Sequence, residues 1–418
     1  MSSNGRPEDG RLRQALLGAA VVCLAVLPLG GVAALRSVSL ATATVLALAV
    51  LAAARGRRAA PVPSPGAAIL VPLALWALWA SSSLLWSHAP AYTLRELRAE
   101  FAWSLATMVV FYVAADGVFA LRTLALTVLA GLALMTGLAL VLAPFGGPFA
   151  AGIWHGGVGA YATYLVLAAP VLVVLVAPPP VGFRGPTTVL VAAVLLCGLL
   201  LAAARLTDNR MVWIALAAIG ATAAVLAGLR WRAAVLRAPV RWLGPVAVLL
   251  VALGVLFADA AREKARVHFP PDTTVVETIE RDPRLPLWSH TAALISERPW
   301  TGYGFGKEML RQELRGSLGD PTLSHAHNVF ISQWLQTGVV GLALLIALLA
   351  AIGWRYVRFY RSANDALALL GVVGLSLLAG FIVKNLTDDF LVRSNGRLFW
   401  ALNAAILGWG IRQERASP

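Results

Sequence analysis

Cationic and hydrogen-bonding side chains gather in one polar stretch, residues 259–328, of a chain that is otherwise mostly apolar. Its three motifs are residues 284–288 (RLPLW), 299–306 (PWTGYGFG) and 324–328 (SHAHN). Arginine side chains bind phosphate oxygens through two parallel hydrogen bonds, and histidine can exchange a proton near neutral pH. The combination favours chemistry on an anionic, lipid-linked substrate.

The pair His325 and His327 lies directly before a long apolar segment, and three roles are open to it. Two histidines at positions i and i+2 lack the spacing of a helical zinc pair, so we expect no metal. Asn328 could cap the following helix by accepting hydrogen bonds from its free backbone amides. A helix N-terminus also disfavours imidazolium, which would keep a histidine neutral and available as a base. The sequence leaves both histidines as candidates.

Arg205 and Arg210 are the first and last residues of the polar sequence RLTDNR, which lies between two apolar runs. Each arginine could place its head among lipid headgroups or clamp a phosphate group, and Arg210 is better placed because it begins a helix. Arg284 and Trp288 lie four residues apart and predict a short amphipathic helix at the membrane surface. Arg284 either meets lipid headgroups or faces a cleft together with Arg210.

Two further polar sequences indicate a particular function less clearly. The glycine run in residues 302–306 has neither a preceding strand nor a GK[ST] sequence, so a turn with aromatic packing is the better interpretation. Asp388 and Asp389, with Lys384 and Arg393, end an apolar run. Such charges indicate a water-filled cavity, an internal ion pair or an ordinary ion pair in a loop.

The composition indicates an α-helical integral membrane protein. The chain has 418 residues, of which 59% are hydrophobic and 13% charged, and it lacks the short alternating segments of a membrane β-barrel. Its net charge is +14, but the basic residues lie in short loops, as orientation signals do, which argues against nucleic-acid binding. Cys23 and Cys197 lie in apolar runs and predict no disulfide or zinc site.

Apolar runs of about 20 residues predict twelve spans. They cover residues 13–34, 38–54, 67–86, 101–118, 121–144, 158–178, 186–204, 211–229, 239–258, 329–352, 365–384 and 396–411. The first run is expected to be a retained span rather than a cleaved signal peptide, although Pro28, Gly30 and Gly31 could turn or kink it. The domains expected are spans 1–9 (1–258), a large loop with short helices (259–328) and spans 10–12 (329–418).

Basic clusters set the expected orientation. A cytoplasmic N-terminus places the arginines near residues 6–13, 55–58, 230–241 and 355–361 inside, in agreement with the positive-inside rule. The large loop between spans 9 and 10 then faces outward, toward the periplasm in a bacterial inner membrane.

The three motifs, followed by the apolar sequence FISQWLQTGVVGLALLI, resemble the signature region of bacterial O-antigen ligases. Related O-antigen polymerases and protein O-oligosaccharyltransferases share parts of this region. The motifs cover residues 284–347, and the remainder is similar in span number and loop position.

This resemblance implies a function. Such ligases transfer a polysaccharide from undecaprenyl pyrophosphate to a sugar hydroxyl of the lipid A–core at the periplasmic face. They are metal-independent, need no cofactor and have a GT-C-like arrangement of transmembrane helices. Their essential arginines match Arg210 and Arg284 by position, and their essential histidine lies within residues 325–328.

The mechanism that the resemblance implies is a single displacement with inversion. Two guanidinium groups would stabilise charge on the departing pyrophosphate, and a neutral histidine would take the proton of the attacking hydroxyl. The remaining candidates for substrate contact are Arg205, Trp288, Asn328 and Asp389.

Two alternatives remain open at this point. A polymerase or a protein ligase would use similar residues and differ only in the acceptor. A transporter is a rival of another class because twelve spans are common there, but the two halves show no evident similarity.

Overall fold

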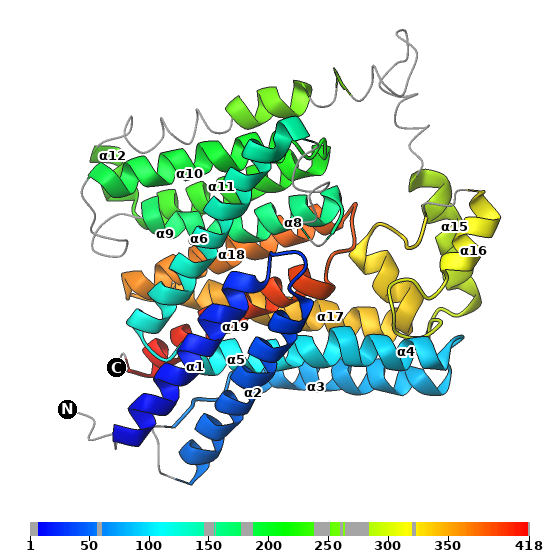
Figure 1. The fold of residues 1–418 in the computed structure, drawn as a ribbon, viewed down its shortest axis with the longest axis horizontal. Coiled ribbons are helices and arrows are strands. Elements are labelled where there is room, and N and C mark those ends of the chain that lie inside the picture. Colours follow the sequence, from blue (N-terminus) through cyan, green and yellow to red (C-terminus); the bar gives the residue numbers. More distant parts are fainter. Residues whose placement is uncertain are drawn as a thin grey trace.

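A computed structural model describes residues 7–56, 61–145, 154, 156–176, 187–237, 251–259, 262–263, 284–319 and 323–416. This part of the chain is helical and contains no β-strand (Figure 1). The helices are α1 (Pro7–Val26), α2 (Ala33–Arg55), α3 (Ala67–Ser82), α4 (Pro90–Glu96), α5 (Trp103–Ala114), α6 (Val118–Leu142), α8 (Val158–Ala168), α9 (Val173–Val176), α10 (Thr187–Arg205), α11 (Arg210–Arg230), α12 (Arg232–Arg237), α15 (Arg284–Glu297), α16 (Arg311–Leu318), α17 (Val329–Tyr360), α18 (Asp365–Asn385) and α19 (Arg393–Ala416).

Eight helical segments in the described ranges are long and apolar enough to cross a membrane. They are Ala33–Arg55, Ala67–Leu85, Pro90–Ala114, Val118–Leu142, Val158–Leu175, Arg210–Arg230, Val329–Tyr360 and Asp365–Asn385. Helix α10 adds a shorter apolar segment, Val191–Arg205. The protein is therefore a polytopic helical membrane protein, while the count of twelve spans stays a prediction. Residues 239–250 of the expected ninth span lie outside the described residues.

Two expected boundaries are wrong for local reasons. The first span does not continue to residue 34, because α1 ends at Val26 and Pro28 and Gly31 lie in a turn before α2. The fourth span begins at Pro90 rather than residue 101, since a π-helical turn, Leu97–Ala102, joins α4 to α5. Its charged residues resemble a loop in sequence, yet the helix continues through them.

The helices form a bundle whose two ends differ (Figure 1). Helices α15 and α16 lie at one end, on the right of Figure 1, and both chain termini lie at the opposite end. We call these the site end and the terminal end. A small hydrophobic cluster that includes Leu287, Leu294, Leu314 and Leu335 packs α15 and α16 onto the first turns of α17.

The glycine run fastens this small cluster to the bundle. Backbone amides of Tyr303 and Gly304 donate to the carbonyls of Leu335 and Gln336 at 3.0 and 2.9 Å. The helical backbone of α17 is interrupted by a kink at Gly338 (φ 69°). A Cβ atom at this position would lie 2.0 Å from the carbonyl oxygen of Trp300. The predicted turn with aromatic packing is confirmed, and its tight contact with α17 holds the loop in place.

Candidate active site

Asn328 caps the N-terminus of α17 and forms a hydrogen bond with the residue that follows α18. Its Oδ1 accepts hydrogen bonds from the amides of Phe330 (2.9 Å) and Ile331 (3.2 Å), which confirms the predicted N-cap. Its Nδ2 donates to the carbonyl of Leu386, just after α18, at 2.9 Å. Both ends of the amide are thus engaged by the protein, and they fix the residue next to His327.

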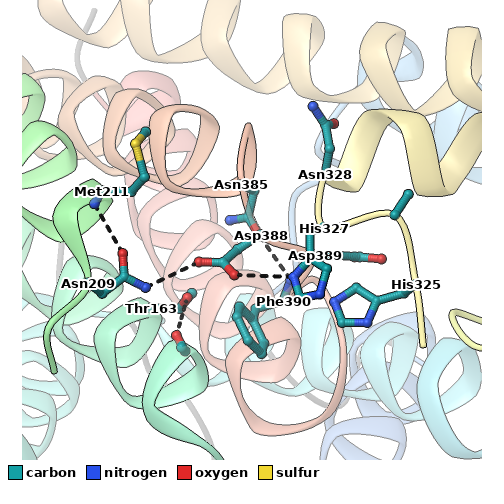
Figure 2. A network of polar contacts seen from close by, with 12 residues as sticks. Thr163, Asn209, Met211, His325, His327, Asn328, Asn385, Asp388, Asp389 and Phe390 are labelled. Atoms are coloured by element: carbon teal, nitrogen blue, oxygen red, sulfur yellow. Dashed lines mark hydrogen bonds and ion pairs between the residues drawn. The ribbon is translucent and has the colours of Figure 1, made fainter. Parts of the chain in front are cut away.

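His327 lies between this cap and the turn that follows α18. Its backbone adopts φ 50°, a conformation that non-glycine residues rarely take, so the surrounding contacts must hold it there. Its Nδ1 lies 4.0 Å from Oδ1 of Asp388, an ion-pair distance longer than a hydrogen bond (Figure 2). One third of the side chain is exposed. The Nδ1 atom of His327 therefore faces a carboxylate, and the exposed part of its side chain is accessible to a substrate.

His325 has a different environment although its ring packs against His327, with 4.0 Å between ring centroids. Its Nδ1 lies 2.9 Å from the hydroxyl of Ser324, and its buried Nε2 has no hydrogen-bond partner. Burial, followed by the charges of Lys307 and His327, lowers the pKa of His325 from 6.5 to about 2. His325 is thus neutral, as expected of a base, and burial is the main cause.

Asp388 connects three parts of the chain. The Lys384 ammonium, fully buried, donates to its Oδ2, and the Asn209 amide lies 3.5 Å from the same atom (Figure 2). The internal ion pair considered for this segment is confirmed. Burial would raise the pKa of Asp388, but His327 and Lys384 outweigh it and lower the value from 3.8 to about 2. The carboxylate is therefore ionised next to His327.

Arg210 is brought to this cluster by its neighbour. Asn209 caps α11 by accepting from the amide of Met211 at 3.1 Å while its own amide faces Asp388, so the first residue of α11, Arg210, lies at the site end. The guanidinium is partly exposed and has no ion-pair or hydrogen-bond partner in the described ranges.

Arg205 contrasts with Arg210, five residues away. Its guanidinium forms ion pairs with Asp208 (3.0 Å), Asp259 (3.3 Å) and Glu263. Three carboxylates already surround this side chain, so its positive charge is largely neutralised before any substrate arrives.

Arg284 and Trp288, on the first turns of α15, approach the cluster from the loop. Arg284 lies within electrostatic range of the Lys384 ammonium. The indole Nε1 of Trp288 donates to the carbonyl of Ala326 at 2.9 Å. Ala326 separates the two histidines in residues 324–328, which we call the histidine turn. This hydrogen bond therefore holds the backbone of the histidine turn in position.

Asp389 and Lys307 complete the cluster. Lys307 donates to the backbone carbonyl of Asp389, and its ammonium lies 4.6 Å from the ring centroid of Phe390. Burial lowers the pKa of Lys307, although Asp389 and Asp388 oppose that shift. Oδ2 of Asp389 is buried without a hydrogen-bond partner, so this carboxylate can still accept a donor.

The family model described as O-antigen ligase matches residues 192–346. This part of the chain is therefore similar to O-antigen ligases. The matched residues contain both candidate arginines, Arg210 and Arg284, and both histidines, His325 and His327. No curated protein matches the chain.

Part of the candidate site, including Asp388, lies beyond the matched residues. Sequence reasoning did not assign Asp388, Lys307 or Asn209 to the site, because their contacts join residues 82 to 179 positions apart. The spacing of Lys384 and Asp388, four residues apart at the end of an apolar run, was the one available signal. No group of three His, Cys, Asp or Glu side chains suited to a metal ion occurs among the described residues.

Proposed function

We propose that the protein is an O-antigen ligase, an inverting glycosyltransferase that moves a polysaccharide from undecaprenyl pyrophosphate to a sugar hydroxyl of the lipid A–core. The observation that carries this proposal is the position of His327, partly open and backed by Asp388, at the same end of the bundle as Arg210 and Arg284. The match of residues 192–346 to the O-antigen ligase family model supports the substrate class.

The cations of the site fit a pyrophosphate leaving group. Arg210 has no carboxylate partner in the described ranges, and Arg284 lies within electrostatic range of Lys384. When the bond between the anomeric carbon and the pyrophosphate oxygen breaks, both electrons of that bond go to the oxygen. Guanidinium groups at this position stabilise the charge that develops there, and pyrophosphate then needs no proton to leave.

His327 is the general base in this proposal. The acceptor hydroxyl oxygen forms the new bond to the anomeric carbon, and its proton passes to Nε2 of His327 as the pyrophosphate departs on the opposite face. Asp388, 4.0 Å from Nδ1, acts as a positioning residue that stabilises the imidazolium formed. His325 is less suited to this role, because its side chain is nearly fully buried and its pKa is about 2.

The other site residues take supporting roles. Trp288 and Asn328 position the histidine turn, since their polar groups are bonded to Ala326 and Leu386. Asp389 is a candidate for contact with a substrate hydroxyl through its free Oδ2. We place the protein in a bacterial inner membrane with this site toward the periplasm, because α2, α11 and α17, whose last turns carry described arginines of the basic clusters, end at the terminal end.

A reconstituted reaction tests the assignment. Purified protein would receive carrier-linked glycan together with lipid A–core, a second carrier-linked repeat or an acceptor peptide, with and without a chelator. We expect transfer to lipid A–core only, unaffected by the chelator. Transfer to the second carrier-linked repeat would instead identify a polymerase, transfer to peptide a protein ligase, and failure with every acceptor would overturn the proposal.

Two histidine variants separate the base from its neighbour. We expect His327→Gln to lower kcat by about 10²- to 10⁴-fold, the usual contribution of a general base. His325→Gln should keep the wild-type pH profile between pH 5 and 8, because a group with a pKa of about 2 stays neutral throughout that interval. A changed profile in His325→Gln with wild-type behaviour of His327→Gln would reverse the assignment.

A further inference from the structure

A cavity lies at the site end, separate from the histidine cluster (His325, His327 and Asp388). Its volume is about 750 Å³, and its walls come from the start of α4, the last turn of α15 and the segment that leads into α16. Pockets of this size hold drug-sized molecules rather than single ions. None of the residues assigned to the transfer reaction lines it.

The walls of this cavity are held by hydrogen bonds. The hydroxyl of Tyr303 lies 3.0 Å from the carbonyl oxygen of Leu294 and 2.8 Å from Oε2 of Glu297. The backbone amide of His88 donates to the carbonyl of Tyr303 at 2.8 Å, and the amide of Glu308 donates to the hydroxyl of Tyr92 at 3.0 Å. The cavity is thus preformed in the folded chain.

The lining suits a ligand rich in hydroxyl groups. Three arginines and three glutamates line the cavity, so their formal charges cancel and polyphosphate is not favoured there. The arginines are Arg95, Arg298 and Arg311, and the glutamates are Glu297, Glu308 and Glu313. Carboxylates accept and guanidinium groups donate hydrogen bonds, and a sugar hydroxyl can do both.

Aromatic rings stand beside these charges. Tyr92 and Tyr303 line the cavity, and the guanidinium carbons of Arg95 and Arg298 lie 5.0 Å from their respective ring centroids. Rings that combine an apolar body with a polar edge fit the faces and hydroxyl groups of a sugar. Arg95, Gln312 and Glu313 remain exposed and can contact a ligand directly.

The cavity is connected to the transfer site through one short segment. Lys307 contacts Asp389 beside the histidine cluster, and the next residue, Glu308, lines the cavity. Arg311, also in the lining, lies within electrostatic range of His325. A chain of sugar residues bound in the cavity could therefore extend to the reacting groups.

We propose that the cavity between α4, α15 and α16 is a glycan-binding subsite that holds sugar residues of a substrate away from the bond that reacts. This proposal rests on the proposed function. The same hydroxyl chemistry is offered by the oligosaccharide of the acceptor and by the glycan of the donor, and the experiment separates these two sources.

Steady-state kinetics of the full chain in lipid nanodiscs test the subsite. Arg95→Ala and the double variant Gln312→Ala/Glu313→Ala change exposed side chains, and Arg98→Ala is the matched control because Arg98 is exposed but does not line the cavity. We expect the apparent KM of one substrate to rise about tenfold at unchanged kcat, the size expected from one or two lost hydrogen bonds. A rise for lipid A–core identifies the acceptor, and a rise for the carrier-linked glycan identifies the donor.

Unchanged KM values for both substrates, or equal effects of Arg98→Ala, would overturn the subsite. Direct binding provides a readout that does not depend on transfer: delipidated core oligosaccharide and free O-antigen glycan would each be added to the protein and followed by saturation-transfer NMR. We expect a signal from one glycan that weakens in the cavity variants. Absence of transfer in the wild-type protein would overturn the ligase assignment, whereas absence of binding by either glycan would overturn the subsite.

Discussion

The two ends of the bundle carry similar residues but pair them differently. At the terminal end, arginines meet carboxylates of neighbouring segments: Arg13 with Asp116 (3.3 Å), Arg230 with Asp365 (3.0 Å), and Arg355 with Glu414 (2.7 Å). At the site end, Arg210 has no partner in the described ranges, and Lys384 is buried with Asp388. Paired arginines also occur at the site end, among them Arg205 with its three carboxylates, Arg95 with Glu96 and Arg311 with Glu308.

This difference separates two uses of positive charge in one membrane protein. Paired arginines near the surface join helices and contribute little free energy individually, about 0–1 kcal/mol. In the described part of the site end, Lys307, Lys384 and Arg210 gather around Asp388 and Asp389, and such a group of cations favours an anion. In the function that we propose, Arg210 and the buried Lys384, rather than the number of arginines, distinguish the site end.

The largest expected effect compares an arginine from each end. Arg210→Ala or Arg284→Ala should lower kcat by about 10²- to 10³-fold, as loss of a group that stabilises a developing negative charge does. Arg358→Ala removes a half-exposed partner of Glu414 and should leave kcat within about twofold, since surface ion pairs contribute about 0–1 kcal/mol. Membrane insertion and thermal unfolding would be measured for all three. Equal loss of transfer in Arg358→Ala would remove the distinction between the two ends.

The next effect concerns the buried pair at the site end. Lys384→Met leaves Asp388 buried without its cation and should destabilise the fold by about 3–5 kcal/mol. The double variant Lys384→Met/Asp388→Asn should recover part of this stability without recovering transfer, because His327 still lacks its carboxylate. Thermal unfolding in detergent gives the stabilities. Full stability of the single variant would show that the pair resembles those of the terminal end.

The same pair predicts a dependence on pH. Folding lowers the pKa of Asp388 from 3.8 to about 2, so its carboxylate contributes stability that is complete above roughly pH 4 and is lost as the pH falls toward 2. Asp388→Asn should therefore unfold with a weaker dependence on pH in this acidic interval.

The smallest effect tests how the histidine turn is positioned. Trp288→Phe keeps the ring but removes the hydrogen bond to Ala326, a loss of about 1 kcal/mol. We expect kcat to fall about tenfold at unchanged KM. Trp300→Phe is the control, because Trp300 is 68% exposed and belongs to neither the cavity nor the histidine cluster. A similar decrease in both variants would indicate a general effect of tryptophan loss on the loop.

Much of the fold could be predicted from composition alone. Runs of about 20 apolar residues gave the positions of α6, α11 and α18 closely, because the membrane interior excludes polar side chains. The Asn328 cap was predictable because capping depends on a residue and its nearest neighbours. The start of the fourth span at Pro90 was not predictable, because helices tolerate charged residues near the membrane surface.

The site was predicted only in part for a related reason. Arg210, Arg284 and the two histidines carry chemistry that residue type reveals. Asp388 and Asn209 depend on how α11 packs beside α18, and one sequence without its fold contains no direct sign of such packing. The choice between His325 and His327 likewise required the burial of one ring and the carboxylate beside the other.

Asn328 has a consequence for how a lipid carrier could reach the reacting groups. Its side chain ties the first turn of α17 to the carbonyl that follows α18, beside His327. A polyisoprenoid tail entering between these two helices would have to break that tie and displace the histidine at the moment it is needed. Lateral entry from the bilayer should therefore pass between other helices, with α17 and α18 serving as the fixed wall of the passage.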